Sequence, residues 1–167
     1  MRRRARRGNA MVELTLVGIP VVFALISIFE LARGMWQYHT LAYAVKEGTR
    51  YAIVHGQGCA AAGCRKTIGD VAQQIRHRGV GLVPADVQLE FESKRGGVIR
   101  CTLSDCLTRT AASDVWPPAG SDSPGTEVTI RGTYRLRSML VMMSPVGATG
   151  GGYIFDLPAA STELIQF

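Results

Sequence analysis

A continuous apolar stretch near the N-terminus constrains this 167-residue chain more than any other feature. Residues Ala10–Phe29 read AMVELTLVGIPVVFALISIF and carry a single charge, on Glu13. A helix of about 20 residues spans roughly 30 Å, the thickness of the hydrocarbon core of a bilayer. The stretch therefore predicts a membrane-spanning helix.

The flanks of this stretch predict its orientation. Five arginines lie within Met1–Gly8, whereas the opposite flank carries charges of both signs. Because cytoplasmic flanks are rich in Lys and Arg, we expect Met1–Gly8 in the cytoplasm and the chain beyond about Gln37 outside it. Trp36 and Tyr38 lie where aromatic residues mark the outer interface. A cleaved secretory signal and a buried core helix fit less well, because no small-residue cleavage site interrupts the helical pattern and clustered arginines precede it.

Charge placement limits the partners of the remaining chain. The formal net charge is +6, but without Met1–Gly8 there are 14 basic and 13 acidic residues. This near-neutral balance argues against a nucleic-acid partner. With 47% hydrophobic and 19% charged residues, the chain is also unlike a disordered, charge-rich tail.

The helical pattern continues beyond the apolar stretch to about Val54. Its expected apolar stripe comprises Leu31, Met35, Tyr38, Ala42, Val45, Thr49 and Ala52. Pro20 should loosen or kink the helix. We thus expect a basic leader at 1–8, a long helix at 9–55 with its membrane span at about 10–29, and an exported domain at 56–167.

Glu13 is the most informative residue, because an ionisable group in hydrocarbon costs at least about 2.5–3.5 kcal/mol. One interpretation places it near the cytoplasmic interface, where it reaches water. The other gives it a pairing partner within the membrane.

The residues around Glu13 resemble the processing site of type IV prepilins and pseudopilins. Gly8 follows the arginine cluster, and Glu13 is the fifth residue when Asn9 is counted as the first. The resemblance implies that a membrane aspartic peptidase cuts between Gly8 and Asn9. It also implies that Glu13 pairs with the new N-terminal amine of an adjacent subunit.

The sequences GNAMVEL and FELARGMWQYHTLAYAVKEGTRYAIVHG, with Ala44–Ala52 within the second, narrow the resemblance to the TadE-like pseudopilins of the Tad (tight adherence, Flp) pilus system. Asn9 stands where many type IV pilins have an aromatic residue, and Leu14 stands where major Flp pilins have Tyr. Both departures favour a minor pilin that helps to initiate or regulate pilus assembly and surface adhesion.

This resemblance implies a location and a set of partners. The location is the bacterial inner membrane, with one span, a cytoplasmic N-terminus and a periplasmic C-terminal domain, and incorporation into the extracellular pilus stays open. The partners are the prepilin peptidase, other pseudopilins, the major Flp pilin, the inner-membrane platform and the assembly ATPase.

The remainder of the chain predicts a small α+β domain with an antiparallel sheet. A loop at Gly56–Gly63 precedes a short helix from Ile68 that ends at Gly79. Val87–Glu92 and Val128–Leu136 alternate as strands. Weaker strand candidates are Val98–Leu103, Tyr153–Leu157 and Thr162–Phe167. Ser113–Gly125 is expected to be a turn-rich loop, in which Trp116-Pro117-Pro118 forms a rigid surface turn or, alternatively, a docking edge.

The four cysteines are spaced as Cys59-x4-Cys64 and Cys101-x4-Cys106. In an exported domain we expect two disulfides, with pairing inside each loop as the first choice. The two other connectivities stay open, as do free thiols and a zinc site, although the spacing departs from short zinc knuckles.

Candidate catalytic residues are sparse. His39, His55 and His77 are expected at helix surfaces, and Ser104-Asp105 and Ser121–Ser123 as turn formers. The run Gly147–Gly152 lacks the Lys-Ser/Thr ending of a phosphate-binding loop. We therefore expect a structural protein without a cofactor or metal. The alternatives are an uncleaved, signal-anchored periplasmic binding domain and a membrane-tethered hydrolase that uses loop residues after Gly96.

Overall fold

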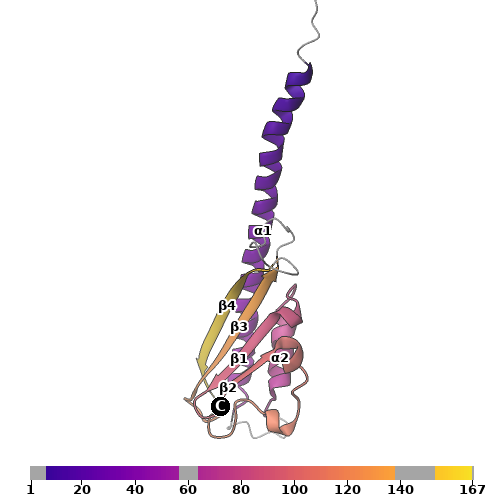
Figure 1. Cartoon of the computed structure of the whole chain (residues 1–167). Helices are drawn as coiled ribbons and strands as arrows, with labels where there is room; N and C mark the ends of the chain where they lie inside the picture. Colours follow the sequence, from indigo (N-terminus) through magenta and orange to yellow (C-terminus); the bar gives the residue numbers. More distant parts are fainter. Residues whose placement is uncertain (1–6, 57–63, 138–152, 167) are drawn as a thin grey trace, which may run out of the picture. The chain divides into compact units, whose positions relative to one another are not determined.

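The computed structural model describes residues 7–56, 64–137 and 153–166 (Figure 1). The helices are α1 (Arg7–Ile53), α2 (Ile68–Arg78) and α3 (Leu103–Cys106), with single 3-10 turns η1 (Pro84–Asp86) and η2 (Ala112–Asp114). The strands are β1 (Val87–Ser93), β2 (Gly97–Thr102), β3 (Glu127–Arg137) and β4 (Tyr153–Leu164). The chain divides into an N-terminal unit, Met1–Met35, and a C-terminal unit, Trp36–Phe167.

The expected architecture, a long apolar N-terminal helix followed by a small α+β domain, is confirmed. α1 begins at Arg7 rather than Asn9, ends at Ile53, and continues through Pro20. The C-terminal unit includes the last part of α1, which supplies side chains to its core, including Leu41 and Val45.

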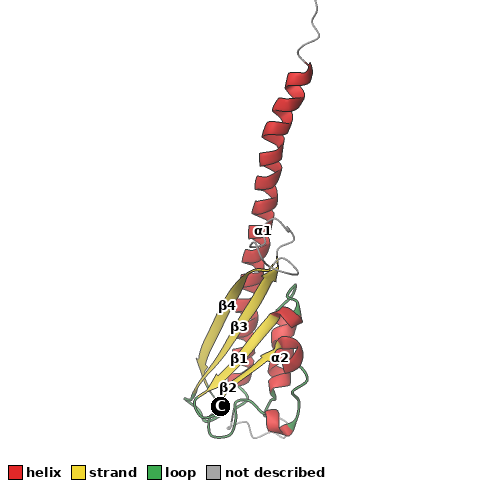
Figure 2. Cartoon of the chain, viewed as in Figure 1, coloured by secondary structure: helices red, strands yellow, loops and turns green. Residues whose placement is uncertain are grey.

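The four strands form one antiparallel sheet in the order β2-β1-β3-β4 (Figure 2). β1 and β3 lie where the alternation predicts them, and β2 lies at the weaker candidate Val98–Leu103, shifted by one residue. The expectation of two separate strands at the C-terminus was wrong, because a single strand, β4, runs from Tyr153 to Leu164. β3 provides an antiparallel partner along this length, and Pro158 is tolerated because β4 is an edge strand, where a missing N–H breaks no ladder.

The sheet and the helices of the C-terminal unit form two layers, and the strands lie in front of the helices in Figures 1 and 2. Alternate residues of β1 and β3, such as Leu89, Phe91 and Ile130, are buried. α2 adds Ile68, Val71, Ala72 and Ile75 to the same core. One face of the sheet is therefore covered by helices, and the opposite face is open.

The second half of the expected stripe is confirmed, since Val45, Thr49 and Ala52 are buried. The first half is not, because Leu31, Met35 and Tyr38 are exposed. Leu41, Ala44 and Gly48 complete the buried side of α1. Small residues set this choice, because they let backbones approach closely. A Cβ on Gly132 of β3 would lie 2.8 Å from Val45 Cγ2, and one on Gly48 would lie 2.5 Å from Ile75 Cγ1. These contacts pack the last part of α1 against both the sheet and α2.

Trp116 is neither in a surface turn nor at a docking edge, and both expectations were wrong. Its side chain is 1% exposed and packs edge-on against Phe91, with ring centroids 5.2 Å apart. The Trp116 backbone N–H donates to the Lys66 carbonyl oxygen at 3.0 Å. Burial of the large indole outweighs the turn-forming tendency of the two prolines that follow.

α2 has a defined start and stop. The Thr67 hydroxyl accepts from the Asp70 N–H at 3.2 Å, and the Asp70 carboxylate accepts from the Thr67 N–H at 2.8 Å. This capping box was not anticipated, although the sequence Thr-Ile-Gly-Asp carries its signal. Gly79 ends the helix as expected, and its N–H donates to the Ile75 carbonyl oxygen at 2.8 Å.

Candidate functional site

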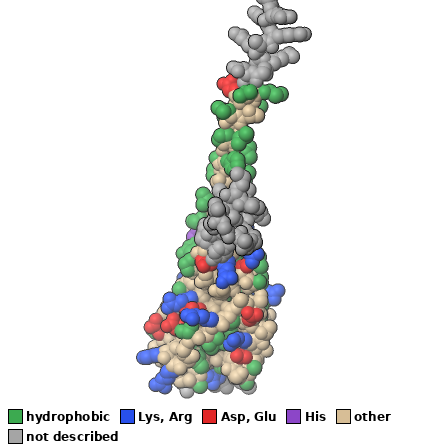
Figure 3. Space-filling model, in the orientation of Figure 1, with side chains coloured by type: hydrophobic (Ala, Val, Ile, Leu, Met, Phe, Trp, Pro, Cys, Tyr) green, Lys and Arg blue, Asp and Glu red, His purple; other side chains and the backbone are tan. Residues whose placement is uncertain are grey.

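The predicted processing and pairing residues all lie near the start of α1. Gly8 and Asn9 belong to its first turns, and Glu13 follows one turn later. The Glu13 side chain is exposed between apolar neighbours that are also exposed, such as Met11 and Leu14. The arginines at positions 2, 3, 4 and 6 lie outside the described residues. Hydrophobic side chains dominate this part of the helix in Figure 3.

In the described ranges 7–56, 64–137 and 153–166, one helix is long and apolar enough to cross a membrane. It reaches a mean hydropathy of 2.3 over an 18-residue window, none of which is buried inside the chain. A surface this apolar is stable only in lipid or against other apolar helices. The helix suggests a single-pass membrane anchor.

The cysteines of the C-terminal unit differ in how far the structure describes them. Cys101 at the end of β2 and Cys106 in α3 form a disulfide with a Cα–Cα distance of 5.5 Å. This is the local pairing named first from the spacing. Cys64 is also disulfide-bonded, and Cys59 lies outside the described residues. The Cys101–Cys106 bond ties α3 to an edge strand of the sheet.

The open face of the sheet carries most of the charged side chains of the strands. Cross-strand register places Arg100, Glu90 and Arg131 side by side on β2, β1 and β3. Arg100 Nε donates to Glu90 at 3.1 Å, and Arg131 Nη2 donates to Glu92 at 2.9 Å. Opposite charges alternate across the face, which favours the observed register but adds little stability at exposed positions.

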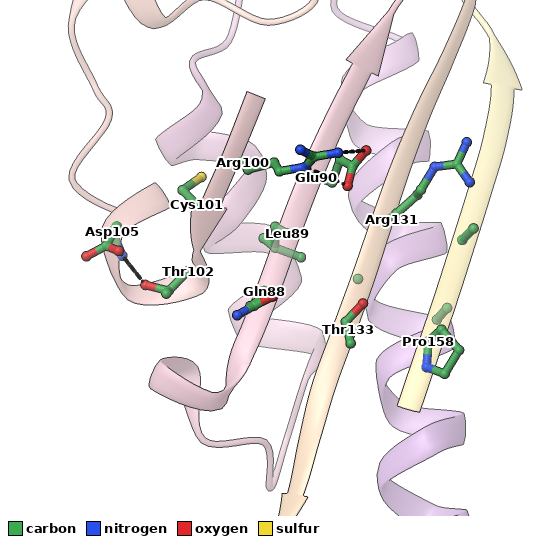
Figure 4. Close-up of a pocket in the computed structure, with 13 residues that line it drawn as sticks. Gln88, Leu89, Glu90, Arg100, Cys101, Thr102, Asp105, Arg131, Thr133 and Pro158 are labelled. Atoms are coloured by element: carbon green, nitrogen blue, oxygen red, sulfur yellow. Dashed lines mark hydrogen bonds and ion pairs between the residues drawn. The ribbon is translucent and has the colours of Figure 1, made fainter. Parts of the chain in front are cut away.

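A hollow of about 670 Å³ lies on this open face (Figure 4). Its lining combines the ion-paired Glu90 and Arg100 with small or neutral side chains from all four strands: Gln88, Thr102, Thr133, Pro158 and Ala160. Asp105 lies at its margin and accepts a hydrogen bond from the Thr102 hydroxyl at 2.7 Å. The hollow is shallow and its lining is mixed, with polar and apolar side chains. The charged strand residues that line it are already in ion pairs.

The ion pair on this face alters the pKa values of both partners. The hydrogen bond from Arg100, with a smaller contribution from its charge, lowers the pKa of Glu90 below 4.5. The same hydrogen bond raises the pKa of Arg100. Both shifts stabilise the charge states that are normal at neutral pH, and neither activates a catalytic group.

The residues weighed as catalytic candidates are dispersed. His39 and His77 are exposed, and His55 Nδ1 lies 2.6 Å from the Tyr51 carbonyl oxygen. Gly147–Gly152 lies outside the described residues. Among the residues that the structure describes, no group of three His, Cys, Asp or Glu side chains could hold a metal ion.

The Ser-Asp pairs organise local backbone. Ser121 Oγ accepts from the Arg95 N–H at 2.8 Å, and the buried Asp122 carboxylate accepts from the Gly120 N–H at 2.9 Å. Asp122 also forms an ion pair with Arg65. The Asp105 N–H donates to the Thr102 hydroxyl at the start of α3. Ser121 and Asp122 thus lie in a loop, as expected, whereas Ser104 and Asp105 lie in α3 and not in a turn.

The fold and the apolar helix together define a class: a protein with one candidate N-terminal membrane anchor and a two-layer α+β domain. Residues 8–50 match the family model described as TadE-like protein. The resemblance drawn from Gly8, Glu13 and Ala44–Ala52 is confirmed over this segment, and it suggests a protein associated with a Tad pilus, with partners in that system. No curated protein and no solved structure matches the chain.

Proposed function

We propose that this protein is a minor pilin or pseudopilin of a Tad-type pilus, with a structural and not an enzymatic role. One observation carries the proposal: Gly8, Glu13 and a long, otherwise uncharged apolar stretch occur together in one helix, inside the segment that matches the TadE-like family. The protein starts in the inner membrane with its N-terminus in the cytoplasm and its C-terminal domain in the periplasm. It then helps to initiate or regulate pilus assembly and surface adhesion.

In this scheme, proteolytic cleavage creates the positive charge that pairs with Glu13. A prepilin peptidase cuts after Gly8, and the amine of Asn9 becomes the first group of the chain. Asn9 and Glu13 are four residues apart, which is one turn and about 6 Å along the helix axis. A neighbouring helix displaced along the axis by about this distance brings its Glu13 level with the amine. Opposite charges in a low-dielectric medium compensate each other only when they are close.

The pair sets register more than stability. Burying two ions costs much of what their attraction returns, so the net gain is small. A misaligned neighbour leaves both charges unpaired, which is expensive in hydrocarbon. The pair therefore selects one axial offset between subunits, while apolar contacts along the helix supply the attraction. The partners in this scheme are the other pseudopilins and the major Flp pilin, acted on by the platform and the assembly ATPase.

N-terminal sequencing of the protein from a host that contains the peptidase tests the first step. A mature chain that begins at Asn9 supports the proposal, and a chain that keeps its arginine-rich leader contradicts it. Glu13→Gln tests the second step, because it removes the charge and preserves the side-chain shape. We expect this variant to be processed normally but to be lost from the sheared pilus fraction and from cross-links to other pilins. Thr15→Ala, in the same apolar stretch, is the matched control.

A second candidate is an uncleaved, anchored binding domain, and the hollow on the open sheet face favours it. Such a domain needs the anchor but no charge within it. It would therefore function normally with Glu13→Gln and would retain its leader. The same two measurements thus separate the two functions.

A further inference from the structure

The C-terminal unit carries a second exposed apolar region, which begins in sequence directly after the N-terminal unit. It is a shallow hollow lined by Trp36, His39, Thr40, Tyr43, Arg78 and Val80. The side chains of Trp36, Tyr43 and Val80 are 66%, 51% and 68% exposed. We call this the aromatic patch. All its residues lie in the C-terminal unit, and it combines one side of α1 with the segment that follows α2.

The helix packing explains how these two segments meet. Gly48 of α1 faces Ile75 and Val71 of α2, whereas Gly79, just past the end of α2, faces Ala44. Residues that come later in α2 thus contact residues that come earlier in α1, so the two helices are antiparallel. The C-terminal end of α2 therefore lies beside the part of α1 that directly follows the apolar window.

The turn after α2 presents an apolar side chain at its tip. The Leu82 N–H donates to the Gly79 carbonyl oxygen at 3.2 Å, and Gly81 has a φ of +85°. These are the features of a type II turn, with Val80 at its first central position. An exposed valine at a rigid tip, beside Trp36 and Tyr43, indicates a surface that is covered in the working protein.

The charged residues beside the aromatic patch indicate what kind of partner covers it. Arg76, His77 and Arg78 form the last turn of α2, and all three are exposed. In the described part of the chain, neither Arg76 nor Arg78 is in an ion pair. The carboxylate of Asp86, in the 3-10 turn η1 that follows in the sequence, is paired with Arg137 at 2.7 Å. Trp and Tyr beside unpaired arginines are characteristic of protein surfaces at the level of lipid headgroups.

We propose that the aromatic patch and the last turn of α2 form a peripheral membrane-binding surface that holds the C-terminal unit against anionic lipid headgroups. Val80, Tyr43 and Trp36 insert at the interface, and Arg76 and Arg78 contact headgroup phosphates. Trp36 is the first residue of the unit, so the chain itself brings the patch to the end of the anchor. The inference rests on the proposed membrane anchor but not on assembly into a pilus. It adds a second contact that fixes the orientation of the domain at the membrane before assembly.

Tryptophan quenching in vesicles tests this surface with the full-length chain. Trp36→Phe leaves Trp116, which is 1% exposed, as the background fluorophore. Into this background Val80→Trp is introduced, with Val98→Trp as the matched control, since Val98 is 46% exposed on β2. The vesicles contain phosphatidylcholine and phosphatidylglycerol, with or without brominated acyl chains, which quench tryptophans that reach the bilayer.

We expect the added tryptophan at position 80 to lose most of its emission in brominated vesicles and the one at position 98 to be unaffected. Arg76→Gln with Arg78→Gln, or high salt, should reverse much of the loss, because screening weakens headgroup contacts. Equal quenching at positions 80 and 98 would overturn the proposal. The proposal would also be overturned if the tryptophan at position 80 were shielded only when the protein-to-lipid ratio is high. The patch would then bind a second copy of the chain and not the lipid. Vesicle flotation distinguishes failure of the membrane-binding surface from failure of the membrane anchor. A chain that does not float with the vesicles contradicts the anchor itself.

Discussion

Gly48→Ala has two opposing effects on the free energy of unfolding: a gain in helix propensity and a steric clash with α2. In an exposed helix this substitution stabilises by about 1 kcal/mol, because alanine restricts the unfolded chain. At position 48 the new Cβ would lie 2.5 Å from Ile75 Cγ1 and 2.9 Å from Ile75 Cδ1. Real Cβ atoms essentially never approach so closely, and such overpacking costs about 1–3 kcal/mol. We therefore expect a net destabilisation of about 1 kcal/mol.

Removing the clashing atoms should reverse the sign. Ile75→Ala alone costs about 2–5 kcal/mol, because Ile75 is fully buried. In that background the Cβ added at position 48 enters vacated space, and Gly48→Ala should stabilise by up to about 1 kcal/mol. The double-mutant cycle should thus show a coupling of about 2 kcal/mol between the two positions.

Urea unfolding of the full chain in mild detergent measures both effects. In the Trp36→Phe background, fluorescence reports on the buried Trp116. Gly18→Ala in the same helix is the control, since a Cβ there meets nothing within 4 Å, and the unfolding midpoint of the C-terminal unit should not change. If Gly48→Ala stabilised both backgrounds equally, the packing of α1 against α2 deduced here would be wrong.

Three further predictions concern the C-terminal unit. Replacing Cys101 and Cys106 together by serine should lower the free energy of unfolding by about 2 kcal/mol, the chain-entropy value for so short a loop, as measured by the urea midpoint. Trp116→Ala should cost about 3–5 kcal/mol because the indole is buried against Phe91, whereas Trp36→Ala should leave the same midpoint within about 0.5 kcal/mol. The pKa of Glu90 is lower in the folded state than in the unfolded chain, so its contribution is present above about pH 4.5 and lost as the pH falls through the folded value. Glu90→Gln should therefore be slightly less stable than the parent at pH 7, and this difference should shrink as the pH is lowered below about 4.5. A difference that stays constant as the pH falls would refute the assignment.

Local patterns in the sequence were sufficient to predict several helices and strands of this protein. The apolar stretch around Glu13 predicted the first part of α1, alternation predicted β1 and β3, and the glycine at position 79 predicted the end of α2. These features depend on side chains that are close in sequence, so periodicity alone reveals them. The spacing from Gly8 to Glu13 belongs to the same category, since it is fixed by chain length.

Contacts between distant segments required the structure. The first half of the stripe on α1 was wrong because glycines and alanines, which carry little hydropathy signal, let the helix approach β3 and α2 at Gly132 and Gly48. Trp116 was assigned to a surface turn because its prolines dominate the local pattern, whereas Phe91 provides its burial.

The sequence by itself thus determined an apolar helix with one carboxylate and a set of amphipathic segments, because periodicity and chain spacing are local properties. Only the tertiary structure decided which face of the sheet is open and which side of α1 is buried. It also placed Val80 and Arg78 beside Trp36. These outcomes follow from packing between segments far apart in the chain, where shape and burial outweigh local preference.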